Sequence, residues 1–179
     1  MLLESLIGST ARIKIIRKLF LNPAQEGYLR GLEEELGESS NSIRIELNRL
    51  LNADLLVSWF QGNRRYFKAN VRNPYFDDLQ GILKREAGLD VLTEGLESNL
   101  PELEAIYLSG DLSRGLETGI LDLLLVGRPN PYELVKHLNR LEKLNGRKIR
   151  FIIFQKKKDK TFLKILKVEK PLLLWEKKK

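Results

Sequence analysis

Apolar positions in the first third of the chain repeat at helical spacing in three successive segments. They span residues 9–20, 29–36 and 39–51, and each places apolar side chains three and four positions apart. Two alternating runs follow, at 55–60 and 64–69, with a glycine-containing turn between them. The pattern therefore predicts three helices and then a β-hairpin.

The third of these segments has one apolar and one polar face. Ile43, Leu47 and Leu50 share the apolar face, opposite Arg44 and Asn48. Arginine can hydrogen-bond to guanine and asparagine to adenine, so this segment is interpreted as a recognition helix for double-stranded DNA. The order of the elements predicts a winged helix-turn-helix domain.

The expected DNA contacts divide into two groups. Contacts with bases are expected from Asn41, Ser42, Arg44 and Asn48. Contacts mainly with phosphates are expected from Ser40, Arg49 and the hairpin residues Arg64 and Arg65. An amphipathic helix with a solvated polar face, or a winged fold that docks proteins, would give the same pattern, and both alternatives stay open.

The rest of the chain predicts a mixed β-sheet with packed helices. Helices are expected from Phe76, from Leu89 and between Pro131 and Gly146, and the strands are expected at 103–109, 120–127, 149–154, 162–166 and 172–175. The fold class is therefore α+β. The predicted domains are a DNA-binding domain at 1–73, a connecting helix at 74–88 and a sheet domain at 89–179.

Composition narrows the function classes. The 179 residues carry a formal net charge of +7, which favours anionic partners, although part of the charge lies in Lys156–Lys158 and Lys177–Lys179. The chain has no Cys and one His, so we expect no metal site and no cofactor. No apolar run is long enough to cross a bilayer, and we expect a cytoplasmic protein without membrane contact.

The first half resembles bacterial ArsR-like winged-helix regulators, in the subgroup fused to a nucleotidyltransferase-like domain. The resemblance lies in residues 28–32, 38–50 and 62–67. It implies a transcriptional regulator that binds DNA as a homodimer, with the first helix and the helix after the hairpin at the two-fold axis. The alternative, that the apolar residues of these helices dock the second half of the same chain, stays open. Metal sensing, which relatives perform with Cys or His clusters, does not carry over.

The second half is similar to the core of the minimal nucleotidyltransferases. Gly110 matches the family glycine, Asp111 stands where serine is expected, Arg114 begins the matching Arg-Gly pair, and Asp122 matches the second aspartate of Asp-x-Asp. Ile120 occupies the place of the first aspartate, and residues 148–154 contain no third carboxylate. The resemblance therefore implies a degenerate domain with no catalytic residues. Its cleft, formed by Gly110, Asp111, Arg114 and Asp122, is expected to bind a nucleotide or another anion, or to serve assembly alone.

These observations predict a sequence-specific, dimeric, DNA-binding transcriptional regulator that is not an enzyme. The alternative is an active minimal nucleotidyltransferase, or an antitoxin that modifies a partner protein. A third hypothesis is an interaction scaffold that binds neither DNA nor nucleotide. The incomplete carboxylate set favours the first hypothesis over the second, because a two-metal site needs several carboxylates in fixed geometry.

Overall fold

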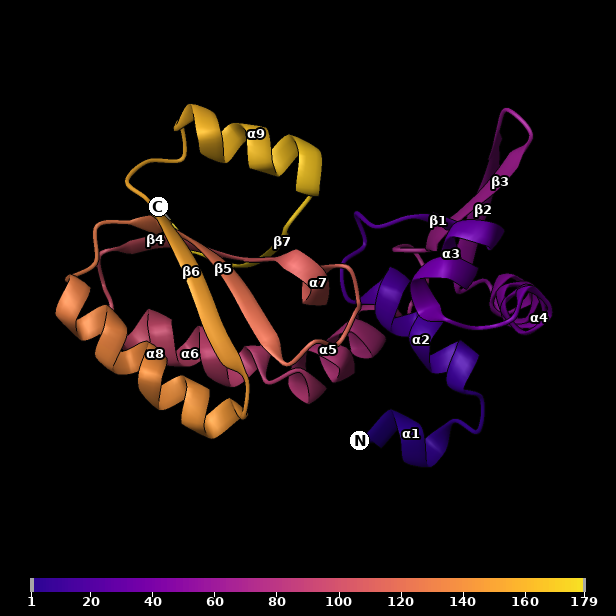
Figure 1. The fold of residues 1–179 in the computed structure, drawn as a ribbon, viewed down its shortest axis with the longest axis horizontal. Helices are drawn as coiled ribbons and strands as arrows, with labels where there is room; N and C mark the ends of the chain where they lie inside the picture. The colour runs from indigo at the N-terminus through magenta and orange to yellow at the C-terminus, as the bar shows by residue number, and fades with distance from the viewer. Residues whose placement is uncertain (1, 179) are drawn as a thin grey trace. The chain divides into compact units, whose positions relative to one another are not determined.

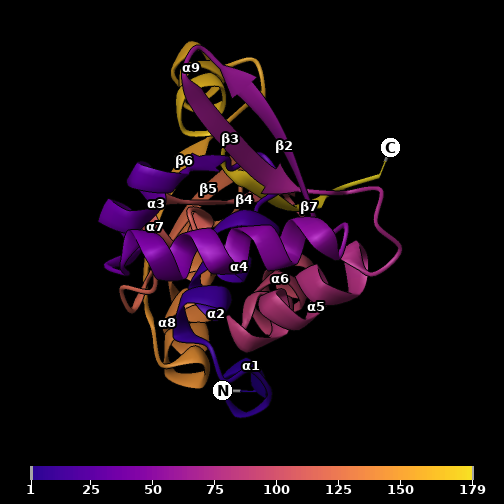
Figure 2. The ribbon, with the colours of Figure 1, turned by 90° about the vertical axis from the view of Figure 1, so that its right-hand side faces the viewer.

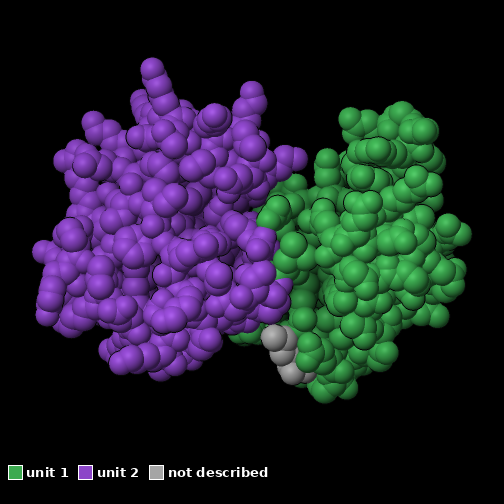
Figure 3. All heavy atoms as spheres, in the orientation of Figure 1, with its two compact units in different colours: residues 1–86, 114–116 green, residues 87–113, 117–179 purple. Residues whose placement is uncertain are grey.

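The computed structural model describes residues 2–178, so Lys179 of the predicted basic tail lies outside it. The chain divides into two compact units, residues 1–86 with 114–116 and residues 87–113 with 117–179 (Figure 3). Each unit has its own sheet, and the secondary structure is α+β. Within the described residues, no helix combines the length and the apolar character that a membrane span needs.

From residue 2 onward, the first unit contains helices and a small sheet (Figure 1). Its elements are α1 (Leu2–Leu6), α2 (Thr10–Phe20), β1 (Gly27–Tyr28), α3 (Leu29–Leu36), α4 (Ser40–Asn52), β2 (Leu56–Gln61), β3 (Arg64–Ala69) and α5 (Phe76–Glu86). The sheet is antiparallel in the order β1-β3-β2. The three predicted helices and the hairpin agree with α2, α3, α4 and β2–β3 to within about a residue at each end.

Local sequence explains where these helices begin and end. Ser9 and Ser39 cap α2 and α4, because each side chain accepts a hydrogen bond from the backbone N–H three residues later, at 3.3 and 3.2 Å. Gly37 ends α3 in the left-handed conformation, with φ of +61°, which glycine adopts without steric cost. Ile15, Leu19 and Ile43 are completely buried, so α2 and α4 share one core.

The second unit consists of a four-stranded mixed sheet with helices on both faces (Figure 1). Its elements are α6 (Leu89–Asn99), β4 (Leu103–Ser109), α7 (Gly110–Ser113), β5 (Ile120–Gly127), α8 (Pro131–Asn145), β6 (Lys148–Phe154), α9 (Lys160–Glu169) and β7 (Leu172–Glu176). The strand order is β6-β5-β4-β7; β5 pairs with β6 in parallel, and β4 pairs with β5 and with β7 in antiparallel orientation. Helices α6 and α8 cover one face, and α9 covers the other (Figure 1).

One predicted strand is wrong. Residues 162–166 belong to helix α9, whose N-cap Asp159 accepts hydrogen bonds from the N–H groups of Thr161 and Phe162 at 2.8 and 3.1 Å. Short apolar runs do not distinguish strand from helix, and here the helical spacing of the apolar residues decides. Phe162, Ile165 and Leu166 pack together against the sheet cluster of Ala105, Leu124, Val126 and Phe154.

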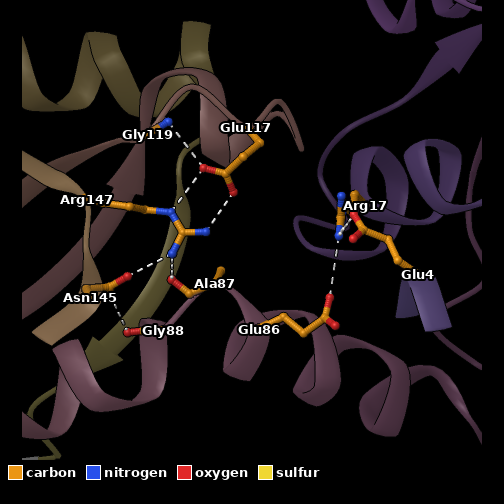
Figure 4. Close-up of polar contacts among 9 residues, drawn as sticks. All are labelled: Glu4, Arg17, Glu86, Ala87, Gly88, Glu117, Gly119, Asn145 and Arg147. Carbon is orange, nitrogen blue, oxygen red and sulfur yellow. Dashed lines mark hydrogen bonds and ion pairs between the residues drawn. The ribbon is translucent and has the colours of Figure 1, made fainter. Parts of the chain in front are cut away.

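Side chains at the end of α8 hold the first residues of the second unit by hydrogen bonds (Figure 4). Arg147 donates from Nη1 to the carbonyl of Ala87 at 2.9 Å, and from Nε and Nη2 to Glu117 at 3.0 and 2.8 Å. Asn145 Nδ2 donates to the carbonyl of Gly88, also at 2.9 Å. These bonds fix the backbone at the start of α6, where Gly88 has a φ of +68°.

Candidate functional site

The first unit has a basic groove between α3, α4 and the β2–β3 hairpin. Figure 2 shows the hairpin rising above the long axis of α4. The groove has a volume of about 850 Å³ and is lined by Tyr28, Leu29, Arg30, Glu34, Arg44, Leu47, Asn48, Asn63, Arg64, Arg65 and Phe67. This lining contains four arginines and one carboxylate, so the groove has a net positive charge and is suited to a polyanion.

A buried carboxylate fixes α4 against α2. Glu46 is 4% exposed and accepts hydrogen bonds from Ser9 Oγ at 2.9 Å, Arg12 Nε at 2.7 Å and Arg49 Nη1 at 2.9 Å. Burial raises the pKa of Glu46, but the hydrogen bonds from Arg12 and Ser9 and the charges of Arg12 and Arg49 together lower it below its ordinary value. The helix is therefore held by an ionised group, two residues before the groove residue Asn48.

Aromatic rings and a serine orient the arginines of the hairpin. The guanidinium of Arg64 lies over the ring of Tyr28, 4.6 Å from its centroid. Arg65 donates from Nε and Nη2 to Ser58 Oγ at 3.0 and 2.9 Å. Trp59 and Tyr66 stack across the two strands with centroids 5.8 Å apart, which stiffens the middle of the hairpin.

Half of the predicted DNA-contacting residues meet in this groove. Arg44, Asn48, Arg64 and Arg65 line it together. The other four lie outside its lining: Asn41 and Ser42 are in the first turn of α4, Ser40 donates to Glu33, and Arg49 pairs with Glu46. The roles of all eight stay predictions.

Sequence reasoning missed two groove residues, Tyr28 and Arg30. Tyr28 ends β1 and is the N-cap residue of α3, and Arg30 is the second residue of α3 and is exposed. Their placement depends on the antiparallel pairing of β1 with β3, which aligns Tyr28 with Tyr66. The sequence did offer a signal for Arg30, because it is a basic residue in the second predicted helix, just before the predicted recognition helix.

The second unit has a smaller hollow between the sheet and α9. It has a volume of about 420 Å³ and is lined by Ser109, Gly110, Asp122, Leu123, Leu124, Arg150, Phe151, Ile152, Ile165 and Glu169. Asp122 accepts two hydrogen bonds from Arg150, at 2.6 Å from Nε and 2.9 Å from Nη2. These bonds and the charge of Asp122 raise the pKa of Arg150. On the other wall, Ser109 Oγ donates to Glu169 at 2.7 Å.

The predicted anion cleft is only partly assembled in this hollow. Gly110 and Asp122 line it together, whereas Asp111 and Arg114 do not. Sequence reasoning missed Arg150 and Glu169, because it sought a carboxylate on β6 and treated α9 as a strand. Among residues 2–178, no group of three or more acidic or histidine side chains is placed to hold a metal ion, so these residues do not fit a two-metal site as they stand.

Comparison with known proteins gives similarity at the level of solved structures. No protein-family model and no curated protein sequence matches the chain. The similar solved structures include toxin–antitoxin complexes. A variant of the MntA–HpeT toxin–antitoxin pair is 17% identical with a TM-score of 0.41, over 50% of this chain and 73% of the other. A tri-AMPylated Shewanella oneidensis HEPN toxin in complex with an MNT antitoxin gives 15% identity and a TM-score of 0.37, over 49% and 69%. The protein AF1382 of Archaeoglobus fulgidus gives 10% identity and a TM-score of 0.37, over 52% and 98%.

These findings change one prediction and leave another open. The prediction that the chain is not an enzyme is contradicted, because the similar structures include an antitoxin in complex with a toxin that carries AMP groups. That prediction is withdrawn, although similarity at this level does not transfer the modification or the toxin to this chain. The resemblance to ArsR-like regulators has no counterpart in these comparisons and stays a prediction.

Proposed function

We propose that the first unit binds double-stranded DNA through the basic groove. The observation that carries the proposal is the convergence of Arg30, Arg44, Arg64 and Arg65 on one groove beside Asn48. The order α2, β1, α3, α4, β2, β3, with sheet order β1-β3-β2, is the order of a winged helix-turn-helix and supports the same conclusion. In this arrangement α4 enters the major groove and the hairpin contacts the adjacent backbone.

The groove geometry refines the roles of its residues. Arg44 and Asn48 are exposed and four residues apart, so they project from the same side of α4 and can reach neighbouring base edges. Arg64 and Arg65 lie next to the hairpin turn and are assigned to phosphates. Ser40, Asn41, Ser42 and Arg49 lie outside the groove lining, at the ends of the surface that α4 would present to DNA.

Exposed apolar residues support binding as a dimer. Leu2 and Leu6 on α1 are 52% and 70% exposed, and Tyr75, just before α5, is 66% exposed. Contact with a second copy would remove these large apolar side chains from water, which lowers the free energy of the system. A two-fold dimer would present two copies of α4 to the halves of an inverted repeat.

Selection from randomised duplex DNA tests the proposal. The full chain is compared with Arg44→Ala and with the control Lys164→Ala, which changes an exposed lysine on α9 outside the groove. The proposal expects an enriched inverted repeat with wild type and with Lys164→Ala, and its loss or relaxation at one base with Arg44→Ala. Absence of any enriched sequence would reject sequence-specific binding.

A second candidate function is transfer of a nucleotidyl group to a partner protein, as in an antitoxin. The observation that favours it is the hollow in which Gly110 and Arg150 meet beside Asp122, since a guanidinium next to a glycine turn suits the phosphate groups of a nucleotide. Such a reaction joins the nucleotidyl group of a nucleoside triphosphate to a hydroxyl of the partner and releases pyrophosphate.

Incubation with labelled ATP and magnesium tests this candidate. The full chain is mixed with a total protein extract, and the label on protein is followed for wild type, Asp122→Asn and the control Glu97→Gln, an exposed change on α6. Labelling that Asp122→Asn abolishes and Glu97→Gln retains would support transfer. Equal labelling with all three chains, or none, would reject this role for the hollow.

A further inference from the structure

Strand β6 is an apolar edge strand of the second unit. It lies at the end of the order β6-β5-β4-β7, and within residues 2–178 no strand pairs with its other side (Figure 1). Phe151, Ile152 and Ile153 are consecutive and 37%, 53% and 38% exposed. Proteins usually protect such edges with charges, proline or a covering element, so an open apolar edge indicates a binding surface.

The backbone of β6 has free hydrogen-bonding groups on this edge. The N–H of Ile149 points away from β5, because it donates to Glu142 Oε1 on α8 at 2.8 Å. Peptide groups alternate sides along a strand, so the N–H and C=O groups of Phe151 and Ile153 point to the same free side. Glu142 thus occupies the first position of the edge and leaves two residues open.

Basic side chains flank the open edge at both ends. Lys148 begins β6, and its side chain is 81% exposed although its Nζ lies 3.4 Å from Glu142 Oε2. Lys156 and Lys158 follow the strand and are exposed, whereas Lys157 between them pairs with Glu176. An antiparallel second copy centred on Ile152 would place Lys148 of each chain opposite Lys156 of the other, and like charges directly opposite are destabilising. A partner with acidic ends does not meet this repulsion.

We propose that β6 docks an extended segment of a different protein, apolar in its centre and acidic at both ends, as a fifth strand of the sheet. Main-chain hydrogen bonds form at Phe151 and Ile153. The partner's apolar side chains contact Ile152 on one face and Phe151 and Ile153 on the other, since successive side chains point to opposite faces. Its acidic ends lie beside Lys148 and Lys156.

Binding of two synthetic peptides to the full chain tests the proposal. Both peptides have an alternating valine–threonine centre, and one carries glutamates at its ends whereas the other carries lysines. Fluorescence anisotropy is expected to show binding of the acidic peptide that is at least about tenfold tighter than that of the basic peptide. Phe151→Pro removes an outward N–H without removing a hydrogen bond to β5. It is expected to weaken binding of the acidic peptide by about tenfold.

A second variant keeps the test independent of strand damage. The double change Lys156→Glu with Lys158→Glu alters only exposed side chains and is expected to reverse the preference between the peptides. Lys164→Glu, an exposed change on α9, is the control and is expected to leave the preference unchanged. Equal binding of both peptides, or no binding of either by the folded wild type, would overturn the proposal. Self-association of the chain that Phe151→Pro abolishes would also overturn it, because the occupant would then be a second copy.

Discussion

Gly110 lies directly against Asp122, so that a Cβ atom added to the glycine would stand 2.2 Å from Asp122 Oδ2. Gly110 also has a φ of +65°. Any side chain at this position would displace the carboxylate from its two hydrogen bonds with Arg150. The glycine is therefore required both by the backbone conformation and by the packing of the hollow.

Substitution of Gly110 is expected to destabilise the second unit more than substitution of Gly119. Gly119 has a similar φ of +71° but nothing lies within 4 Å of its missing Cβ. Gly119→Ala should cost about 1–2 kcal/mol from the left-handed backbone alone, and Gly110→Ala about 1–3 kcal/mol more from the steric clash. Urea unfolding measures both. Adding Asp122→Ala to Gly110→Ala should recover most of the excess, and equal costs for the two glycines would contradict the clash.

Glu46→Gln is expected to lower the free energy of unfolding by about 1–3 kcal/mol at neutral pH, because it removes a charged acceptor from Ser9, Arg12 and Arg49. The folded-state pKa of Glu46 is lowered, so its stabilisation is complete above the unfolded-state pKa and is lost as pH falls through the folded value. Urea unfolding at neutral and acid pH should therefore show the wild-type advantage shrinking in acid. Glu26→Gln, at an exposed position, is the control, and a pH-independent difference would argue against an ionised Glu46.

Arg64→Ala is expected to weaken binding to every DNA sequence and to reduce the slope of log affinity against log salt by about 0.9, the value for one phosphate contact. Loss of the guanidinium also frees the ring of Tyr28. Titrations of specific and random duplexes at several salt concentrations measure the effect, with Lys164→Ala as a control outside the groove. A loss confined to the specific duplex would assign Arg64 to a base instead.

Phe162→Ala is expected to cost about 3–5 kcal/mol, since the ring is 1% exposed and packs against Tyr107 and Phe154 with centroids 5.3 and 5.1 Å away. Leu163, the next residue of α9, is 49% exposed, so Leu163→Ala should change stability by less than about 0.5 kcal/mol. Thermal and urea unfolding compare the two variants. Similar costs at the two positions would contradict the orientation of α9.

Periodicity and capping residues predicted most elements of both units. Strands β4 and β5 agree with their predicted bounds, because proline and glycine residues at their ends limit these apolar runs to the length of a strand. Helix α9 was predicted as a strand, since Phe162 to Leu166 is short enough for either structure. Its helical form depends on the Asp159 cap and on the apolar cluster against which it packs. That cluster is formed by residues distant in the sequence, so the local pattern does not reveal it.

Tertiary pairing also limited prediction of the candidate sites. The exposed arginines of α4 and the hairpin were identifiable from one-sided polarity, and four of the predicted residues line the groove. The buried Glu46 was not, because a carboxylate on the inner face becomes favourable only when Arg12 from α2 reaches it. The same holds for Arg150, which meets Asp122 through the parallel register of β5 and β6.

The order of strands in the second sheet has a consequence for synthesis of the protein. Strand β4 is interior to this sheet, but its neighbour β7 is made up of residues 172–176, near the end of the sequence. During translation, about seventy residues must be added after β4 before β7 can pair with it and cover that side of the strand. Until then its backbone is open to other nascent chains or to chaperones, whereas the segments that form β1, β2 and β3 have all left the ribosome early.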